Sequence, residues 1–262
     1  MANKFRFLLG SVLDTATVTA SSAVDGLAAN NVVDPLVRKV YRTTDTDTEW
    51  IQLQVTGATQ TGVNAFFIGK HNLTKDAIVK VQGNSTSTWS SGPALSTTLT
   101  VATDAQGGVI PKLAHFYSSV EHHRFWRVFL KDDGNTSSYL EVGRIAAGRY
   151  IEPERNLRAG FNISHIDPSR ISKTAGRQGY ANARPQYMEM SYSLHDLDET
   201  EFDTLYGIYN TVGQHTAFVA SLDPEDRPHH NTIYCQFMNP MVRQHRLMRQ
   251  YSLQEVTFQE KN

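Results

Sequence analysis

The sequence predicts a mainly β protein, with an N-terminal jelly-roll β-sandwich followed by a smaller β-rich domain that carries one inserted α-helix. Three observations predict this class. Short segments with alternating or continuous apolar residues recur along the chain, pieces rich in Ser, Thr and Gly separate them, and one segment alone shows a clear helical period. The 262 residues are enough for one large domain or two ordinary ones.

The strands of the first half differ in how their apolar residues are spaced. The segments "EWIQLQVT" and "AIVKVQG" alternate, and "HRFWRVFLKD" places large apolar residues on both faces. The segment "VNAFFIGKH" is almost continuously apolar, as expected for a strand buried inside a sandwich, and "YLEVGRIAAGRYI" completes the set. The loops "QVTGATQTG", "QGNSTSTWSSG" and "TDAQGG" separate these strands, so residues 1–150 are predicted to form the sandwich.

A domain boundary is expected near residues 151–160, because "EPERNLRAGF" interrupts the apolar pattern with a proline and charges. In the second domain, residues 151–262, the segment 187–194 alternates and leads into the helix. The segments "TAFVASLD", "NTIYCQFMN" and "QYSLQEVTFQE" are predicted to be strands that follow it. One helix among antiparallel strands gives a small α+β domain.

The helix is predicted at about residues 199–212. Asp198 can cap it, and Glu201 lies three residues later, which is the spacing of a capping box. Leu197 and Phe202 have the spacing of a hydrophobic staple, and Gly213 provides a left-handed stop. The apolar face is expected to contain Phe202, Leu205, Tyr206, Tyr209 and Val212.

Composition and motifs argue against several classes of function. Charges nearly balance, with 25 Lys plus Arg against 26 Asp plus Glu, so no general attraction to nucleic acid or to a membrane is expected. The apolar run from Phe5 to Leu9 is short and contains Arg6, which does not fit a signal peptide or a membrane span.

The single cysteine, Cys235, is expected to be a buried thiol. No nucleophile elbow, zinc-protease helix motif or nucleotide-binding loop is found, so no enzyme activity and no cofactor are predicted.

The segment "DPEDRPHH", residues 223–230, gathers acidic and histidine side chains and raises the question of a metal or acid–base site. Two prolines interrupt the set Asp223, Glu225, Asp226, His229 and His230, and adjacent histidines on an extended chain point to opposite faces. A zinc site needs three or four ligands held by regular structure. A solvated polar turn is therefore favoured, and no metal site is predicted.

Trp89 is the one tryptophan in a predicted loop, "STSTWSSG", whereas Trp50 and Trp126 lie in apolar strands and are expected in the core. An exposed indole offers flat apolar area on which a sugar can stack. The alternative is a side chain that folds back onto the sandwich. Trp89 is the candidate carbohydrate-binding residue.

The segment "SRISKTAGRQGYANAR", residues 169–184, shows neither a strand nor a helix period. Arg170, Lys173, Arg177 and Arg184 make it basic, and two glycines make it pliable. Such a segment can become ordered against a neighbouring subunit through charge-assisted hydrogen bonds, and these four residues are the candidate subunit interface. A solvated mobile loop is one alternative. Phosphate binding is another, but the Gly-rich turn of a phosphate loop is missing.

The first half resembles the discoidin branch of the galactose-binding-like jelly rolls. The resemblance rests on "ATVTASSAVDGLAANNVVD", "VYRTTDTDTEWIQLQV" and "VNAFFIGKHNLTKDAIVKVQG", with "RFWRVFLKD" as a late strand. It implies a sandwich whose loops at one end bind sugars, lipids or proteins. No binding residue is implied, because such loops vary.

The second half resembles the distal tail proteins of long-tailed bacteriophages, whose belt domains form rings around the tail tube. The resemblance rests on residues 168–225 and on the closing "SLQEVTFQEKN". The domain order departs from the usual one, in which the belt comes first. The resemblance implies a structural protein of the virion tail tip, made in the host cytoplasm. Its expected partners are other copies, other tail proteins and a host-surface glycan. The alternatives are a stand-alone carbohydrate-binding module, which leaves the second half without a role, and another decoration protein of the virion.

Overall fold

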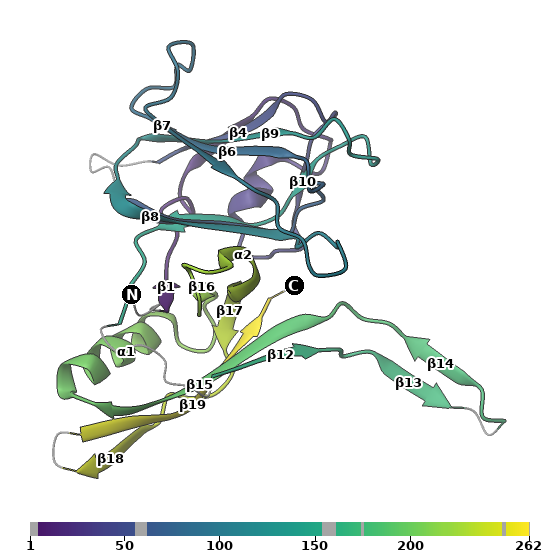
Figure 1. The fold of residues 1–262 in the computed structure, drawn as a ribbon. Coiled ribbons are helices and arrows are strands. Elements are labelled where there is room, and N and C mark those ends of the chain that lie inside the picture. Colours follow the sequence, from purple (N-terminus) through teal and green to yellow (C-terminus); the bar gives the residue numbers. More distant parts are fainter. Residues whose placement is uncertain (1–4, 56–61, 154–160, 174–175, 248–249, 262) are drawn as a thin grey trace. The chain divides into compact units, whose positions relative to one another are not determined.

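The computed structural model describes residues 5–261 apart from 56–61, 154–160, 174–175 and 248–249 (Figure 1). The chain forms two compact units. The first, called the sandwich unit below, contains Phe5–Glu152 and Val219–Thr232. The second, called the helix unit, contains Pro153–Phe218 and Ile233–Asn262. Residues 219–232 lie in the range 151–262 that the sequence pattern placed in the second domain, yet they pack within the sandwich unit.

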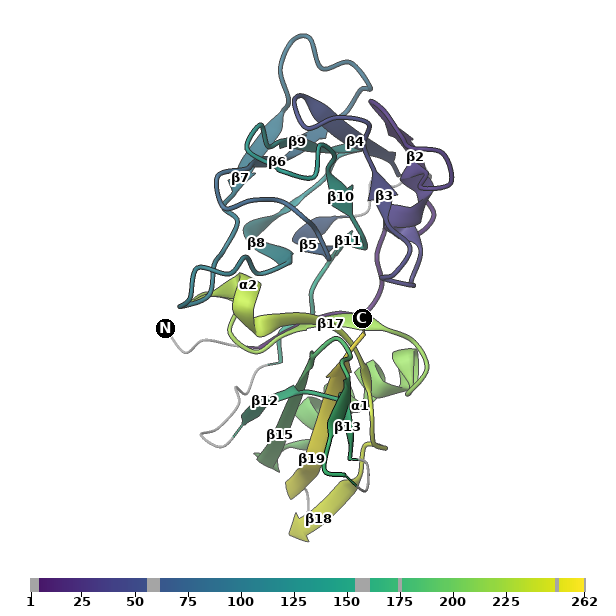
Figure 2. The ribbon, with the colours of Figure 1, turned by 90° about the vertical axis from the view of Figure 1, so that its right-hand side faces the viewer.

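Two antiparallel sheets form the sandwich unit, and Figure 2 shows them as separate layers. The larger sheet has the strand order β2-β4-β9-β6-β7, and the smaller has the order β11-β5-β8. The larger sheet contains β2 (Thr17–Ala20), β4 (Glu49–Gln54), β9 (Phe125–Lys131), β6 (Ile78–Asn84) and β7 (Leu95–Leu99). The smaller contains β11 (Ile145–Gly148), β5 (Val63–Gly69) and β8 (Lys112–Glu121).

The sandwich core fills the space between these sheets, because each strand directs alternate side chains inward. Strand β4 alternates between buried and half-buried residues, whereas β5 is buried along almost its whole length. Trp126 is fully buried and its ring lies 6.2 Å from that of Phe66. The alternating pattern therefore corresponds to a strand with one half-buried face, and the continuous apolar pattern to a strand that is buried on both faces.

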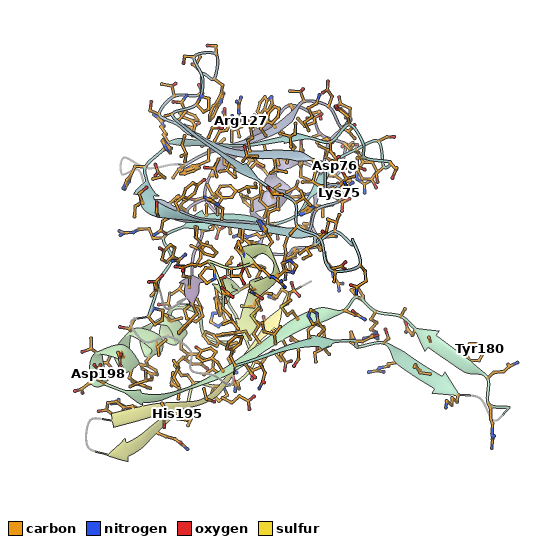
Figure 3. The ribbon with its side chains drawn as sticks, in the orientation of Figure 1. Lys75, Asp76, Arg127, Tyr180, His195 and Asp198 are labelled. Carbon is orange, nitrogen blue, oxygen red and sulfur yellow. The ribbon has the colours of Figure 1, made fainter. Side chains whose placement is uncertain are left out.

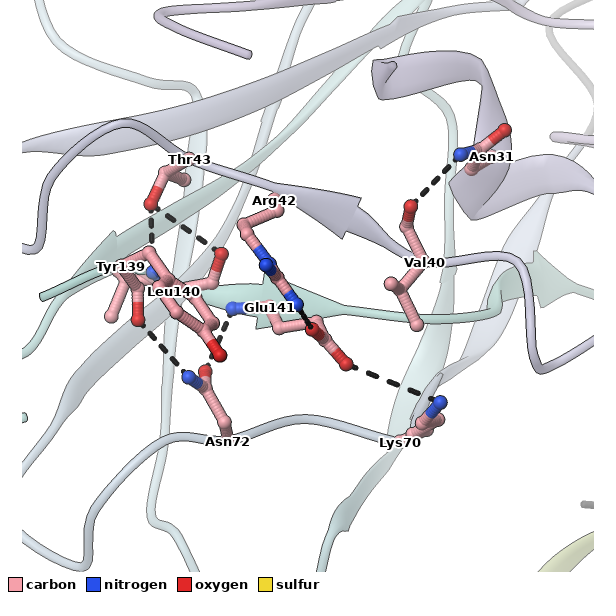
Figure 4. A network of polar contacts seen from close by, with 9 residues as sticks. All are labelled: Asn31, Val40, Arg42, Thr43, Lys70, Asn72, Tyr139, Leu140 and Glu141. Carbon is pink, nitrogen blue, oxygen red and sulfur yellow. Dashed lines mark hydrogen bonds and ion pairs between the residues drawn. The ribbon is translucent and has the colours of Figure 1, made fainter. Parts of the chain in front are cut away.

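Smaller elements complete the sandwich unit. These are β1 (Arg6–Leu8), the 3-10 helix η1 (Ala29–Val33), β3 (Tyr41–Arg42), β10 (Glu141–Val142), β16 (Phe218–Ser221) and α2 (Pro228–Asn231), of which β16 begins one residue before the unit. Strand β1 pairs with β16 through Val219, Ala220 and Ser221. Asn72 joins two loops near β10, because its amide donates to the Tyr139 carbonyl and accepts from the Glu141 N–H (Figure 4).

The helix unit contains a twisted antiparallel sheet in which β15 pairs with both β12 and β19. Strands β17 and β18 also pair with β19. The strands are β12 (Asn162–Ile166), β15 (Tyr187–Leu197), β17 (Thr232–Phe237), β18 (Arg243–Leu247) and β19 (Gln250–Glu260). Buried aromatic side chains dominate this core: the Phe258 ring lies 5.0 Å from Phe237 and 5.3 Å from Tyr192. Cys235 is buried here.

Helix α1 (Glu199–Val212) follows β15 and packs on the aromatic core. The predicted capping box is present: Asp198 accepts from the Glu201 N–H, and Glu201 accepts from the Asp198 N–H. Gly213 ends the helix with a φ of 54°. The predicted apolar face is wrong in one position, because Ile208 is buried whereas Tyr206 is 43% exposed.

The structure confirms a mainly β fold with sandwich architecture. It adds strands that the sequence pattern did not reveal, among them β7, β12 and β18, which have a weak apolar period. It also adds α2 to the single predicted helix. No helix in the described residues is long and apolar enough to cross a membrane.

Candidate functional site

The basic segment that lacked any periodicity forms a β-hairpin, called the arm below (residues 169–184). Strand β13 (Arg170–Lys173) pairs antiparallel with β14 (Gly179–Asn182). The Ser169 hydroxyl accepts from the Arg184 N–H at 2.9 Å and closes the base of the hairpin. The arm leaves the helix unit between β12 and β15 (Figure 1). The expectation of a segment without regular structure is therefore wrong for its paired portions.

Every described residue from 170 to 184 is exposed, including both strands of the arm. Ile171 and Tyr180 are 72% and 63% exposed, and Figure 3 shows Tyr180 far along the arm. Cross-strand partners share a face, so Arg170 and Tyr180 lie on one face while Ile171 and Lys173 lie on the other. Both faces combine a cation with a large apolar side chain, as contact surfaces do.

A free arm of this kind is poorly stabilised. A two-stranded hairpin in water is marginal unless a third strand or a packed face supports it. Here each strand has four residues and buries none of its side chains. The hairpin therefore gains most from a surface outside its own unit on which Ile171 or Tyr180 can be buried.

Trp89 forms the second candidate surface, on the outer face of the larger sheet. Its indole N–H donates to Gln52 Oε1 at 2.7 Å, and the Arg127 guanidinium lies 4.1 Å from its ring centroid. Arg127 in turn donates to Gln82 Oε1 at 2.8 Å. We call Trp89, Arg127, Gln52 and Gln82 the Trp89 platform. Trp89 is half-buried. Its side chain is folded back onto the sheet, which was the alternative to a fully exposed indole, and part of the ring remains exposed.

The acidic and histidine segment 223–230 is less solvated than predicted. Residues 228–231 form α2, which packs on β8 in the sandwich unit. His229 is half-buried, and its Nδ1 accepts a hydrogen bond from the Ala114 N–H at 2.9 Å. Burial, followed by the charge of His230, lowers the pKa of His229 to about 4. Proline at the first helical position explains how the segment becomes helical. Among the described residues no group of His, Cys, Asp and Glu is arranged to hold a metal ion.

Sequence reasoning missed His71, which is 7% exposed and lines a cavity of about 480 Å³. Its Nδ1 accepts from the Leu73 N–H at 3.3 Å, and its Nε2 is buried with no hydrogen-bond partner among the described residues. Burial lowers the pKa of His71 to about 4, with a further contribution from nearby His229. The cavity wall also includes Thr74, Lys75, Val109 and Pro111. The sequence feature that could have drawn attention to His71 is its position two residues after the almost continuously apolar segment that forms β5.

The predicted site residues belong to two different units. Trp89 belongs to the sandwich unit, whereas Arg170, Lys173, Arg177 and Arg184 belong to the arm of the helix unit. Within the described residues no ion pair engages any of these four cations. The Trp89 platform and the arm are therefore tested separately.

No protein-family model and no curated protein matches the sequence. Solved structures match about half of this chain. The lectin domain of lectinolysin complexed with Lewis B antigen is 16% identical, with a TM-score of 0.41, and the match covers 53% of this chain and 96% of that one. A fucose-binding module from Streptococcus pneumoniae is 10% identical, with a TM-score of 0.42, over 54% of this chain and 99% of the other. The family 32 carbohydrate-binding module of NanJ from C. perfringens, in complex with galactose, is 10% identical, with a TM-score of 0.40, over 54% and 98%.

Proposed function

We propose that the protein is a non-catalytic structural protein that assembles with copies of itself through the arm, as a subunit of a bacteriophage tail tip. The observation that carries assembly through the arm is the exposure of every described residue from 170 to 184, including Ile171 and Tyr180, and the tail-tip location rests on the sequence resemblance of the second half. An oligomer that buries these side chains stabilises a hairpin that is marginal alone. Closed rings repeat one heterologous contact around an axis, and a projecting arm suits such a contact.

The assembly proposal is tested with Ile171→Ser/Tyr180→Ser and, separately, with a deletion of residues 173–179. Sedimentation velocity of the intact chain is expected to show an oligomer, and both variants are expected to shift toward the monomer. At a concentration low enough for the intact chain to be monomeric, thermal unfolding of the variants and of the intact chain should coincide, because the substituted side chains are exposed in the single chain. Asn182→Ala, on the same arm, is the matched control and should assemble normally. Variants that assemble like the intact chain would refute the role of the arm.

The virion location has its own test. Mass spectrometry of virions produced from the genome that encodes this chain should detect it in purified particles. Immunogold labelling should place it at the tail tip. Particles that lack the protein would remove the virion part of the proposal and leave self-assembly to be judged by sedimentation.

A second function, recognition of a host-surface glycan by the sandwich unit, is favoured by the Trp89 platform. Arg127 and Gln52 fix the indole while part of it stays exposed. A fixed aromatic surface flanked by hydrogen-bonding groups suits a sugar, whose C–H face stacks while its hydroxyls exchange hydrogen bonds. Lewis B antigen, fucose and galactose, the sugars of the three similar structures described above, are suitable probes.

The glycan proposal is tested on a glycan array with the intact chain and Trp89→Ala. We expect at least one fucosylated or galactosylated glycan to bind, with at least a tenfold loss in the variant. Trp50 shares the outer face of β4 with Gln52 and is half-buried, not in the core as the sequence pattern indicated, so the control is Leu36→Ser, a change of an exposed apolar side chain outside the larger sheet, which should bind normally. Binding that survives Trp89→Ala would place the glycan elsewhere, and no binding to any glycan would end this second function.

A further inference from the structure

The arm carries an unbalanced charge. Residues 169–184 contain Arg170, Lys173, Arg177 and Arg184 and no acidic residue, which gives a charge of +4. The described side chains of these residues are exposed and form no ion pair with other described residues. A partner that matches the arm must supply carboxylates together with apolar area for Ile171 or Tyr180.

The outer face of α1 has those properties. Glu199, Asp203, Tyr206 and Asn210 follow helical spacing and form one exposed stripe. Tyr206 is 43% exposed, although its ring stacks on that of Phe202 at 5.8 Å. Residues 198–212 contain four acidic residues and no Lys or Arg, a charge of −4. The opposite face, with Phe202, Leu205, Ile208 and Val212, is buried, and the stripe is the exposed part of the helix that combines carboxylates with an aromatic ring.

The two complementary surfaces lie at opposite ends of β15 within the helix unit. The arm precedes this strand and α1 follows it directly. Eleven residues of strand, at roughly 3.3 Å each, separate them by about 35 Å. Figure 1 shows the arm and α1 at opposite ends of β15. The arm therefore cannot reach α1 of its own chain, whereas the arm of another copy can.

We propose that the arm of one copy docks on the outer stripe of α1 of the next copy, so that Arg170 meets Glu199 or Asp203 while Tyr180, on the same face of the arm, packs on Tyr206. This inference rests on the proposed assembly and names the surface that receives the arm. Since the donor and the receiving surface differ, the contact is heterologous and propagates head to tail into a ring or a filament. Because it depends on exposed charges, salt weakens it.

The test is a charge-reversal exchange measured by sedimentation velocity. The arm variant is Arg170→Glu/Lys173→Glu and the helix variant is Glu199→Lys/Asp203→Lys. Asp198 and Glu201 are left intact because they cap the helix. Each variant alone should associate at least tenfold more weakly than the intact chain. An equimolar mixture should regain association, because the reversed arm then meets the reversed helix.

Two control variants separate the loss of the docking contact from general effects of the introduced lysines. Lysine in the first turn opposes the helix dipole, so Glu199→Gln/Asp203→Asn supplies a milder variant that should also weaken association. Glu255→Lys, an exposed change on β19, should leave association unchanged. If Ile171→Ser/Tyr180→Ser disrupts the oligomer while both helix variants assemble normally, the α1 surface is wrong and arm-mediated assembly stands. Failure of the mixture to regain association also overturns the inference. A monomeric intact chain overturns both proposals.

Discussion

At the scale of single residues, two buried histidines make the sandwich unit sensitive to acid. Burial is the main cause that lowers the pKa of His71 and of His229 to about 4, below the ordinary value of 6.5. The unfolded chain therefore binds more protons than the folded chain between these values. The stabilisation by neutral histidines is complete above about pH 6.5 and declines as the pH falls toward 4.

We expect the urea midpoint of the sandwich unit to decrease between about pH 7 and pH 5, and to decrease less in His71→Gln/His229→Gln. Tryptophan fluorescence isolates this unit, since Trp50, Trp89 and Trp126 all lie within it. His165→Gln, an exposed position in the helix unit, should leave the pH dependence unchanged. An identical pH dependence in the double variant and the intact chain would show that these histidines are already solvated.

The sequence could identify His229 and Trp89 as unusual residues but could not predict their environments. The prolines around His229 were interpreted as a solvated turn, because the sequence does not show that β8 provides the Ala114 N–H to which it binds. The contacts of Trp89 likewise come from Gln52 and Arg127, which are distant in the chain. The local sequence pattern therefore identifies His229 and Trp89 as candidates, whereas their contacts depend on packing with residues that are distant in the chain.

At the scale of elements, α1 is the best predicted part of the molecule. Capping and apolar spacing are local properties, so the bounds 199–212 and the Asp198–Glu201 capping box could be predicted. The assignment of Tyr206 to the buried face failed because Ile208 completes the packed stripe instead. The arm was missed for the opposite reason: a hairpin that buries nothing has no apolar period to detect.

The helix allows a stability series with a clear order. Asp198→Ala removes the cap and should reduce stability by about 1 kcal/mol. Phe202→Ala removes a ring that is 1% exposed and should cost roughly 3–5 kcal/mol. Tyr206→Ala should cost less than Phe202→Ala because Tyr206 is exposed. Thermal unfolding followed by circular dichroism at the helical minimum checks this order, and equal effects of Phe202→Ala and Tyr206→Ala would contradict the packing.

At the scale of the whole molecule, the sequence predicted the mainly β class and the β-sandwich architecture. It could not predict that residues 219–232 return to the sandwich unit, because strand pairing such as β1 with β16 joins positions more than 200 residues apart. The consequence is a chain whose two units are each built from more than one segment.

The central claim is that the arm works by contact with another copy. The molar mass of the intact chain in solution, measured by multi-angle light scattering over a range of concentrations, tests it most directly. We expect a mass that is a multiple of the 29.4 kDa chain and that falls as salt is raised or the protein is diluted. A mass of one chain at every concentration and at low salt would contradict the claim.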